Sequence, residues 1–166
     1  MRIALPCVVV CIILGAGQLV AQPKYGVTVR TLNRDALAKA KTYEWNESQP
    51  SPDKNIDALI VAAVDRELAT RGLTKLLSGR GDVEVTYRSL SRTDVTATKD
   101  RKDGAFREFA VGSLVVDLTD PTSRQLLFGV RMDTPLEKDP ATLEVTINGA
   151  VKAMFEKYPA PAPPKK

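Results

Sequence analysis

Residues 51–72 read SPDKNIDALIVAAVDRELATRG, and their apolar side chains recur at the spacing of one helix face. Ser51 can cap the N-terminus, Pro52 suits the first turn, and Gly72 can end the helix in the left-handed conformation. We therefore expect a core-packed helix from Pro52 to about Arg71. A membrane-surface or partner helix is the alternative, but the polar face has no basic bias. The apolar stripe consists of Ile56, Leu59, Ile60, Ala63, Val64 and Leu68.

The segments after this helix alternate apolar and polar residues, as strands with one buried face do. Residues 82–88 form the first predicted strand, which runs on toward Leu90. Residues 106–118 and 124–132 form two more. Asp120 and Pro121 between them fit a type I turn, so we expect an antiparallel hairpin. The expected core-facing residues are Leu114, Val116 and Leu118 on one arm and Leu126, Phe128 and Val130 on the other.

Two short strands precede the first helix, and a second helix follows the hairpin. Residues 25–32 and 42–45 are the predicted short strands, because β-branched and aromatic residues dominate them. Apolar residues between Leu143 and Tyr158 recur at helical spacing, and Pro159 ends the pattern. This order of elements predicts an α+β domain of two layers, with a mostly antiparallel sheet and two main helices packed on one face.

The domain organisation follows from the two ends of the chain. Residues 1–21 combine a charged start, an apolar stretch and a small residue before the expected cleavage site after Ala21, as a signal peptide does. An uncleaved anchor is the weaker alternative, because the apolar run is shorter than the roughly 20 residues that span a bilayer. We place the single domain at residues 22–158 and a proline-rich disordered tail at residues 159–166. Residues 98–104 are charged and are predicted to be an exposed loop.

The cysteines bear on the localisation of the protein. Cys7 and Cys11 both lie within the predicted signal peptide, so the mature chain would have no disulfide. Cys11 follows Val10 instead of a small residue near the end of the apolar run, so we expect no lipid anchor. The sequence therefore predicts an exported protein, periplasmic or secreted, that is not integral to the membrane after cleavage.

The composition excludes several function classes. The 166 residues include 24 Lys plus Arg, 20 Asp plus Glu and no His, which gives a formal net charge of +4. Without histidine, His-based metal clusters and Ser-His-Asp or Cys-His catalysis are impossible. Basic and acidic residues are interspersed, so nucleic-acid binding is not expected. We identify no catalytic residue, metal ligand or cofactor site and expect a non-enzymatic protein.

Six motifs follow one another along the chain: Thr42 to Trp45, Leu68 to Leu73, Asp82 to Tyr87, Val111 to Asp120, Leu126 to Gly129 and Ala150 to Pro159. Their order and spacing resemble a bacterial family known as domain of unknown function 4136, over about residues 27–159. This resemblance implies an exported envelope domain, frequently a lipoprotein, with no established activity and no assigned catalytic residues. The missing lipidation cysteine departs from that pattern.

Three aromatic residues are the candidate partner-binding site. Tyr25, Tyr43 and Trp45 could form a platform for a glycan or a peptide. The alternative is packing in the core or at its rim, as is usual for aromatic residues beside an amphipathic helix. An open Trp45 ring beside polar groups would favour binding, and a ring beneath the helix would favour packing.

Two further patterns have structural explanations. Asp117 and Asp120 could form a carboxylate pair for acid–base work or a hard cation, but we expect both to satisfy backbone donors of the turn. Residues 78–81 contain two glycines without the Lys-Ser/Thr of a phosphate loop, so we expect a flexible turn.

These observations leave three hypotheses. The first is a non-enzymatic envelope domain that engages a protein, glycan or lipid partner through a sheet face, a sheet edge or a groove. The second is a small-molecule or lipid carrier, which requires a pocket between helices and sheet. The third is an enzyme that uses carboxylates alone, which requires two acids in one cleft with displaced pKa values.

Overall fold

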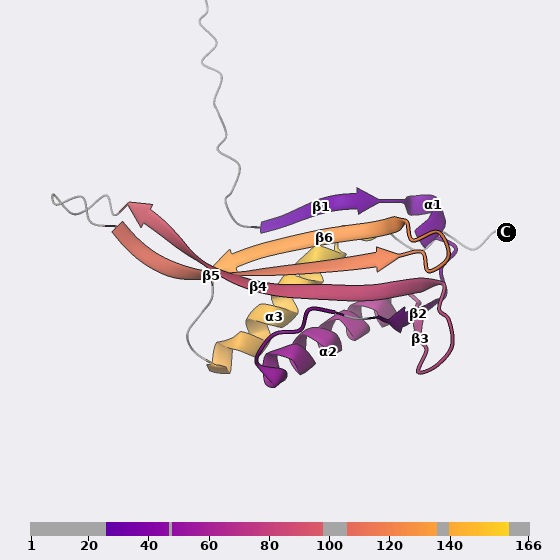
Figure 1. Cartoon of the computed structure of the whole chain (residues 1–166), viewed down its shortest axis with the longest axis horizontal. Helices are drawn as coiled ribbons and strands as arrows, with labels where there is room; N and C mark the ends of the chain where they lie inside the picture. The colour runs from indigo at the N-terminus through magenta and orange to yellow at the C-terminus, as the bar shows by residue number, and fades with distance from the viewer. Residues whose placement is uncertain (1–25, 47, 98–105, 136–139, 160–166) are drawn as a thin grey trace, which may run out of the picture.

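The computed structural model describes residues 26–46, 48–97, 106–135 and 140–159. The predicted signal peptide, Tyr25, the charged loop at residues 98–104 and nearly all of the proline-rich tail lie outside these ranges. The fold is α+β, as predicted, and the helices α2 (Lys54–Thr70) and α3 (Pro140–Phe155) lie on the same side of a sheet (Figure 1).

The sheet has six strands in the order β1-β6-β5-β4-β2-β3. Its neighbours β1–β6, β6–β5 and β5–β4 pair antiparallel, but β2 pairs parallel with both β3 and β4. The sheet is therefore mixed: the pairings of the long strands are antiparallel, as expected, whereas β2 adds two parallel pairings that the sequence analysis did not predict. The strands are β1 (Gly26–Leu32), β2 (Thr42–Trp45), β3 (Thr74–Lys75), β4 (Val83–Ala97), β5 (Phe106–Thr119) and β6 (Leu126–Pro135).

The parallel pairing has a simple cause in the chain path. The helix α2 (Lys54–Thr70) carries the chain from the end of β2 back to the starts of β3 and β4. A crossover through a helix joins parallel strands, whereas a short turn joins antiparallel ones. The tight loop after β5 accordingly yields the predicted antiparallel hairpin with β6.

The ends of α2 show which residues fix its length. Asp53, not Ser51, is the N-cap, and its carboxylate accepts hydrogen bonds from the N–H groups of Asn55 and Ile56. At the other end Gly72 has φ +83°, and the N–H of Leu73 donates to the carbonyl of Leu68, as in a Schellman ending. The remaining helices are α1 (Arg34–Leu37) and α3 (Pro140–Phe155).

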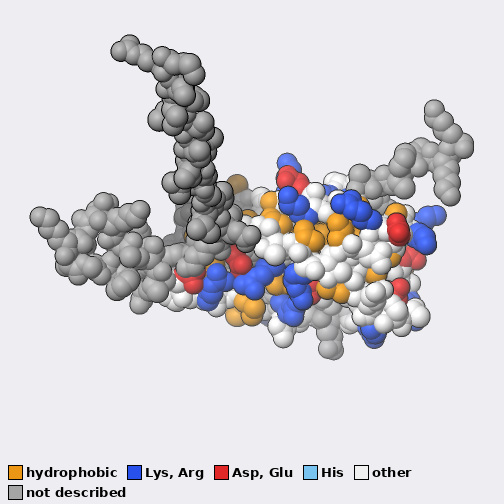
Figure 2. All heavy atoms as spheres, turned by 90° about the horizontal axis from the view of Figure 1, so that it is seen from above, with side chains coloured by type: hydrophobic (Ala, Val, Ile, Leu, Met, Phe, Trp, Pro, Cys, Tyr) orange, Lys and Arg blue, Asp and Glu red, His pale blue; other side chains and the backbone are white. Residues whose placement is uncertain are grey.

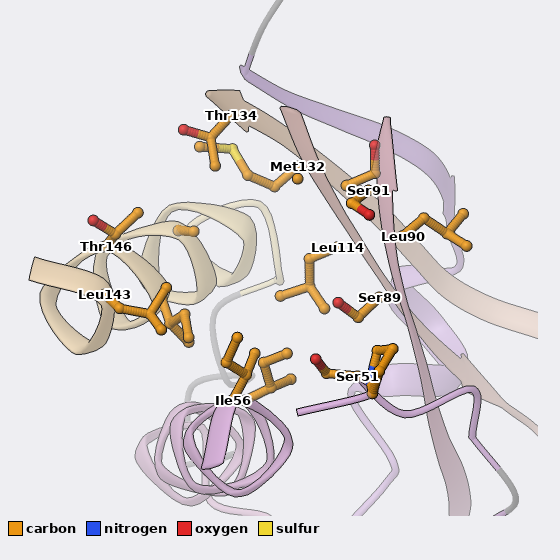
Figure 3. Close-up of a pocket in the computed structure, with 16 residues that line it drawn as sticks. Ser51, Ile56, Ser89, Leu90, Ser91, Leu114, Met132, Thr134, Leu143 and Thr146 are labelled. Carbon is orange, nitrogen blue, oxygen red and sulfur yellow. The ribbon is translucent and has the colours of Figure 1, made fainter. Parts of the chain in front are cut away.

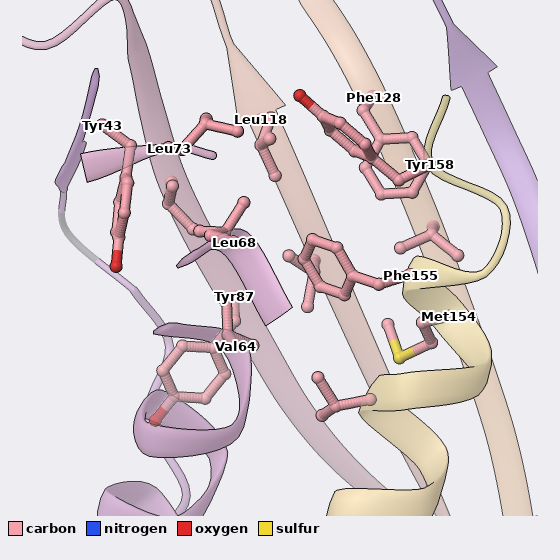
Figure 4. Close-up of a cluster of buried hydrophobic side chains, with 14 of the residues drawn as sticks. Tyr43, Val64, Leu68, Leu73, Tyr87, Leu118, Phe128, Met154, Phe155 and Tyr158 are labelled. Atoms are coloured by element: carbon pink, nitrogen blue, oxygen red, sulfur yellow. The ribbon is translucent and has the colours of Figure 1, made fainter. Parts of the chain in front are cut away.

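The core lies between the sheet and the two long helices (Figure 4). Phe128 on β6 contacts Phe155 and Tyr158, with ring centroids 5.8 and 5.4 Å apart. The predicted inward positions on the β5–β6 hairpin are buried or partly buried. The sheet face toward α2 and α3 is called the inner face below, and the opposite face the outer face.

The strands β4 and β5 continue beyond the rest of the sheet. They pair with each other as far as Ala97 and Phe106, whereas the last pairing of β5 with β6 joins Val111 to Pro135. The distal part of this hairpin is therefore a two-stranded ribbon, and it projects from the body of the domain (Figure 1).

Candidate functional site

An apolar pocket lies between the two long helices and the inner face of the sheet (Figure 3). Its volume is about 280 Å³. Side chains of Ile56 on α2 and Leu143 on α3 face Leu114 and Met132 on the sheet across this space. The complete lining is Ser51, Pro52, Ile56, Ile60, Ser89, Leu90, Ser91, Gly112, Ser113, Leu114, Met132, Thr134, Leu143, Thr146, Ile147 and Ala150.

Small residues on the inner face create the pocket. Ser91 on β4 lies opposite Gly112 on β5, and Ser89 lies opposite Leu114. The next inner pair along β4 and β5, on the side away from the ribbon, is Tyr87 and Val116, and both side chains are buried. The large residues therefore fill the layer at one end, whereas the small ones leave space under the helices at the other.

The lining determines which chemistry the pocket can accommodate. None of the described lining residues carries a charge, and most of the exposed surface within the pocket is apolar. Hydroxyl groups of Ser51, Ser89 and Ser91 lie along one side, and those of Thr134 and Thr146 lie on the other (Figure 3). Met132 adds an adaptable apolar side chain. The pocket therefore suits an uncharged apolar group with a hydrogen-bonding end.

Tyr43 and Trp45, two of the predicted partner-binding residues, connect β2 to α2. Tyr43 is buried, and its hydroxyl donates to Oδ1 of Asp65 at 2.8 Å. Nε1 of Trp45, which is partly buried, donates to the same oxygen at 2.8 Å. Burial, followed by the hydrogen bond to the Asp65 carboxylate, raises the pKa of Tyr43. Tyr43 therefore does not belong to an exposed platform, which corrects that expectation; Tyr25 lies outside the described residues.

The environment of Trp45 also explains this arrangement. Its ring packs edge-on against Tyr87, with centroids 6.0 Å apart. The second oxygen of Asp65 accepts from Nζ of Lys75 at 2.7 Å, so one carboxylate joins β2, β3 and α2. A carboxylate 20 residues away along the chain is not detectable from the local sequence pattern of Trp45.

Asp120 and Asp117 have different partners. Oδ1 of Asp120 accepts from the N–H groups of Thr122 and Ser123, as expected for a turn residue, and these bonds lower its pKa. Asp117 does not serve the turn. Its carboxylate accepts from Arg30 and Arg88 on the outer face, so the expected role of Asp117 was wrong.

A shallow hollow elsewhere brings together Asp82, Asp120 and Lys39. The N–H of Lys41 and the hydroxyl and N–H of Thr42 donate to Asp82 and lower its pKa. Both carboxylates in this hollow are therefore held in the ionised form. Neither is suited to act as a general acid near neutral pH.

The sequence contained a signal for the pocket that its periodicity alone did not reveal. Ser89, Ser91 and Gly112 occupy positions where a core-facing strand normally carries large apolar side chains. A small residue at such a position marks either a weak strand or an unfilled space. Only the pairing of Ser91 with Gly112 in adjacent strands distinguishes the two.

A family model for DUF4136, a domain of unknown function, matches residues 29–160. The chain belongs to the DUF4136 family. No curated protein matches this DUF4136 chain. Within the described ranges, no helix has the length and hydropathy needed to cross a membrane.

Solved structures with a similar fold have low sequence identity to this DUF4136 chain. A PelC dodecamer structure from Paraburkholderia phytofirmans matches with a TM-score of 0.54 and 11% identity, over 82% of this chain and 99% of that one. A PDZ domain protein from Parabacteroides distasonis matches with a TM-score of 0.51 and 13% identity, over 75% of this chain. The match spans 33% of the length of the PDZ protein. These similarities concern the fold alone.

Proposed function

We propose that this DUF4136 chain is an exported, non-enzymatic binding domain of the cell envelope that holds one acyl chain in the apolar pocket. The pocket itself is the observation that carries the proposal. At about 280 Å³ it is slightly smaller than the roughly 300–1,000 Å³ that small-molecule sites occupy. This size fits a single chain better than a lipid with two or more chains.

The lining supports an uncharged, linear ligand. Burial of a charged group in this space would be costly, because none of the described lining residues could neutralise it. An apolar chain would cover Ile56, Leu114 and Leu143 and remove their exposed surface from water. A hydroxyl or ester at the end of the acyl chain could form hydrogen bonds with the serine and threonine hydroxyls along the sides of the pocket.

Two sequence features support the rest of the proposal. The signal-like residues 1–21 support export. The absence of histidine from the chain, together with the hydrogen-bonded carboxylates of Asp82 and Asp120, supports a role in binding over catalysis. This proposal favours the carrier hypothesis among those that the sequence left open.

A displacement assay tests the proposal. The fluorescent apolar probe phenylnaphthylamine should bind the exported chain and be displaced by decanol. Ser89→Leu places a larger side chain in the pocket and should weaken probe binding by at least about tenfold, because it removes the space that the probe occupies. Thr86→Leu on the same strand is the matched control, since Thr86 lies on the outer face. It should leave binding within about twofold of the wild type.

The controls separate loss of the site from loss of the fold. Circular dichroism and thermal unfolding should show that both leucine variants remain folded. The proposal is wrong if the probe does not bind the folded wild type. It is equally wrong if Ser89→Leu and Thr86→Leu bind the probe alike.

A further inference from the structure

Four arginine side chains gather on the outer face of the sheet, which no helix covers in the described structure. They are Arg30 on β1, Arg88 and Arg92 on β4, and Arg131 on β6. Together they are called the arginine face below. Figure 2 looks down on the molecule from above the view of Figure 1 and shows several lysine and arginine side chains in blue on that surface.

The first pair of arginines shares the carboxylate of Asp117. Nη1 of Arg30 donates to both of its oxygens at 3.0 and 3.1 Å, and Nη2 of Arg88 donates to Oδ2 at 2.8 Å. Gly129 on the neighbouring strand makes this arrangement possible. A Cβ at position 129 would lie 3.0 Å from Oδ1 of Asp117.

The second pair shares the carboxylate of Asp133. Arg131 donates to it through Nε at 3.0 Å and also through Nη2, and Nη1 of Arg92 donates to it at 3.2 Å. Burial acts to raise the pKa of Asp133, but the hydrogen bonds from Arg131, Ser113 and Arg92 outweigh it and lower the pKa. The carboxylate therefore stays ionised and holds both guanidinium groups in place. Nε of Arg92 also donates to Asp94 at 3.1 Å.

The charges are arranged in two levels. The side chains of Asp117 and Asp133 are 15% and 17% exposed, whereas those of the four arginines are 36% to 43% exposed. A molecule that approaches this face therefore meets the guanidinium groups before the carboxylates. Each guanidinium has five N–H donors. Arg30 and Arg88 each use only one terminal nitrogen in the described contacts, so further donors are available to a ligand.

The spacing of the two arginine pairs points to an extended ligand. Asp117 lies opposite Gly129, four residues along β6 from Asp133. At about 3.4 Å per residue, the two bridging carboxylates belong to positions separated by about 14 Å along the sheet. A single small anion cannot reach both pairs. A polymer with repeated anionic groups can contact them together, and bidentate guanidinium contacts suit carboxylate and phosphate oxygens.

We propose that the arginine face binds a linear polyanion whose repeating units carry carboxylate or phosphate groups. This site lies on the sheet face opposite the apolar pocket and is independent of the proposed acyl-chain binding. A membrane surface fits less well, because membrane-binding faces bury apolar side chains. Within residues 83–94 of β4, residues 110–119 of β5 and the strand β6, Leu90 is the one large apolar side chain of the outer face that is substantially exposed.

Direct titration of the full chain, purified after export, tests this proposal. Polygalacturonate carries carboxylates and polyphosphate carries phosphates, so a comparison of the two polymers shows which anionic group the arginine face binds. At least one should bind, and its affinity should fall by at least about tenfold between roughly 50 and 500 mM salt. Arg88→Gln/Arg131→Gln should weaken binding by at least about tenfold at low salt. The control Lys152→Gln/Lys157→Gln, with the same change in net charge on α3 and just beyond it, should stay within about twofold.

A second variant, expected to strengthen binding, tests the proposal even if the double arginine variant fails to fold. Asp117→Asn removes a negative charge beneath Arg30 and Arg88 and should strengthen binding by about twofold or more. The proposal is overturned if neither polymer binds. It is also overturned if the arginine and lysine double variants bind equally, or if Asp117→Asn weakens binding while the protein stays folded. Binding to anionic phosphatidylglycerol vesicles without binding to either polymer would overturn it in favour of a membrane surface.

Discussion

The two ends of the helix–sheet layer are built from the same strands and the same two helices, yet one is filled and the other is open. At the closed end, Phe128, Phe155 and Tyr158 occupy the space between β6 and α3. At the open end, Ser91 and Gly112 leave the apolar pocket. The comparison shows that side-chain volume at a few inner positions, and not the path of the chain, decides where this fold has room for a ligand.

Truncation at the closed end should have the largest effect. Phe128→Ala should lower the free energy of unfolding by about 3–5 kcal/mol, because it leaves a cavity among aromatic rings. Leu143→Ala at the open end should cost less than about 2 kcal/mol, since its side chain is only partly buried and borders existing space. Urea unfolding of both variants measures the difference. Equal losses would mean that the open end is packed as tightly as the closed one.

The Asp65 cluster should have an intermediate effect. Asp65→Ala removes the acceptor of the buried Tyr43 hydroxyl and of Trp45, which should cost about 1–3 kcal/mol. Asp65→Asn keeps an acceptor oxygen and should lose less. Chemical unfolding gives the energies, and the emission maximum of Trp45, the single tryptophan of the chain, reports the local change. A larger loss in the asparagine variant than in the alanine variant would contradict this account of the cluster.

The smallest effect at neutral pH should come from Tyr158→Phe. The Tyr158 hydroxyl is buried and has no hydrogen-bond partner in the described structure, so its removal should change stability by less than about 1 kcal/mol at pH 7.

A difference should emerge at high pH. Burial raises the pKa of Tyr158 from 10.0 to about 12. The stability contributed by the neutral phenol is therefore complete below pH 10 and is lost as the pH rises from 10 toward 12. Thermal unfolding between pH 9 and 12 should show a smaller loss for the phenylalanine variant. Parallel pH profiles for the variant and the wild type would exclude this cause.

The sequence predicted the elements whose own residues determine them. The stripe from Ile56 to Leu68 indicated α2, and the alternation around Val116 and Phe128 indicated the core side of the hairpin. The direction of β2 could not be predicted, because a period of two reveals which face a strand buries and not which way its neighbour runs. The predicted N-cap of α2 was Ser51, whereas the observed N-cap is Asp53, because two residues suited to capping lie within one turn.

The candidate sites depended more on distant partners. The contact of Asp117 with Arg30 joins residues 87 positions apart, so no local pattern could distinguish it from a turn interaction. Tyr43 and Trp45 were identifiable as notable aromatic residues, but their common partner, Asp65, lies on α2. The pocket required knowledge of which strands are neighbours.

The ribbon formed by β4 and β5 beyond Val111 has a consequence for local stability. Its backbone hydrogen bonds connect only two strands, and a two-stranded hairpin is marginally stable by itself. Amide protons there should exchange with solvent through fraying of the ribbon, whereas those of β6 near Val130 require opening of the whole domain. The chain thus combines a cooperative body with an appendage that can open and close without unfolding it.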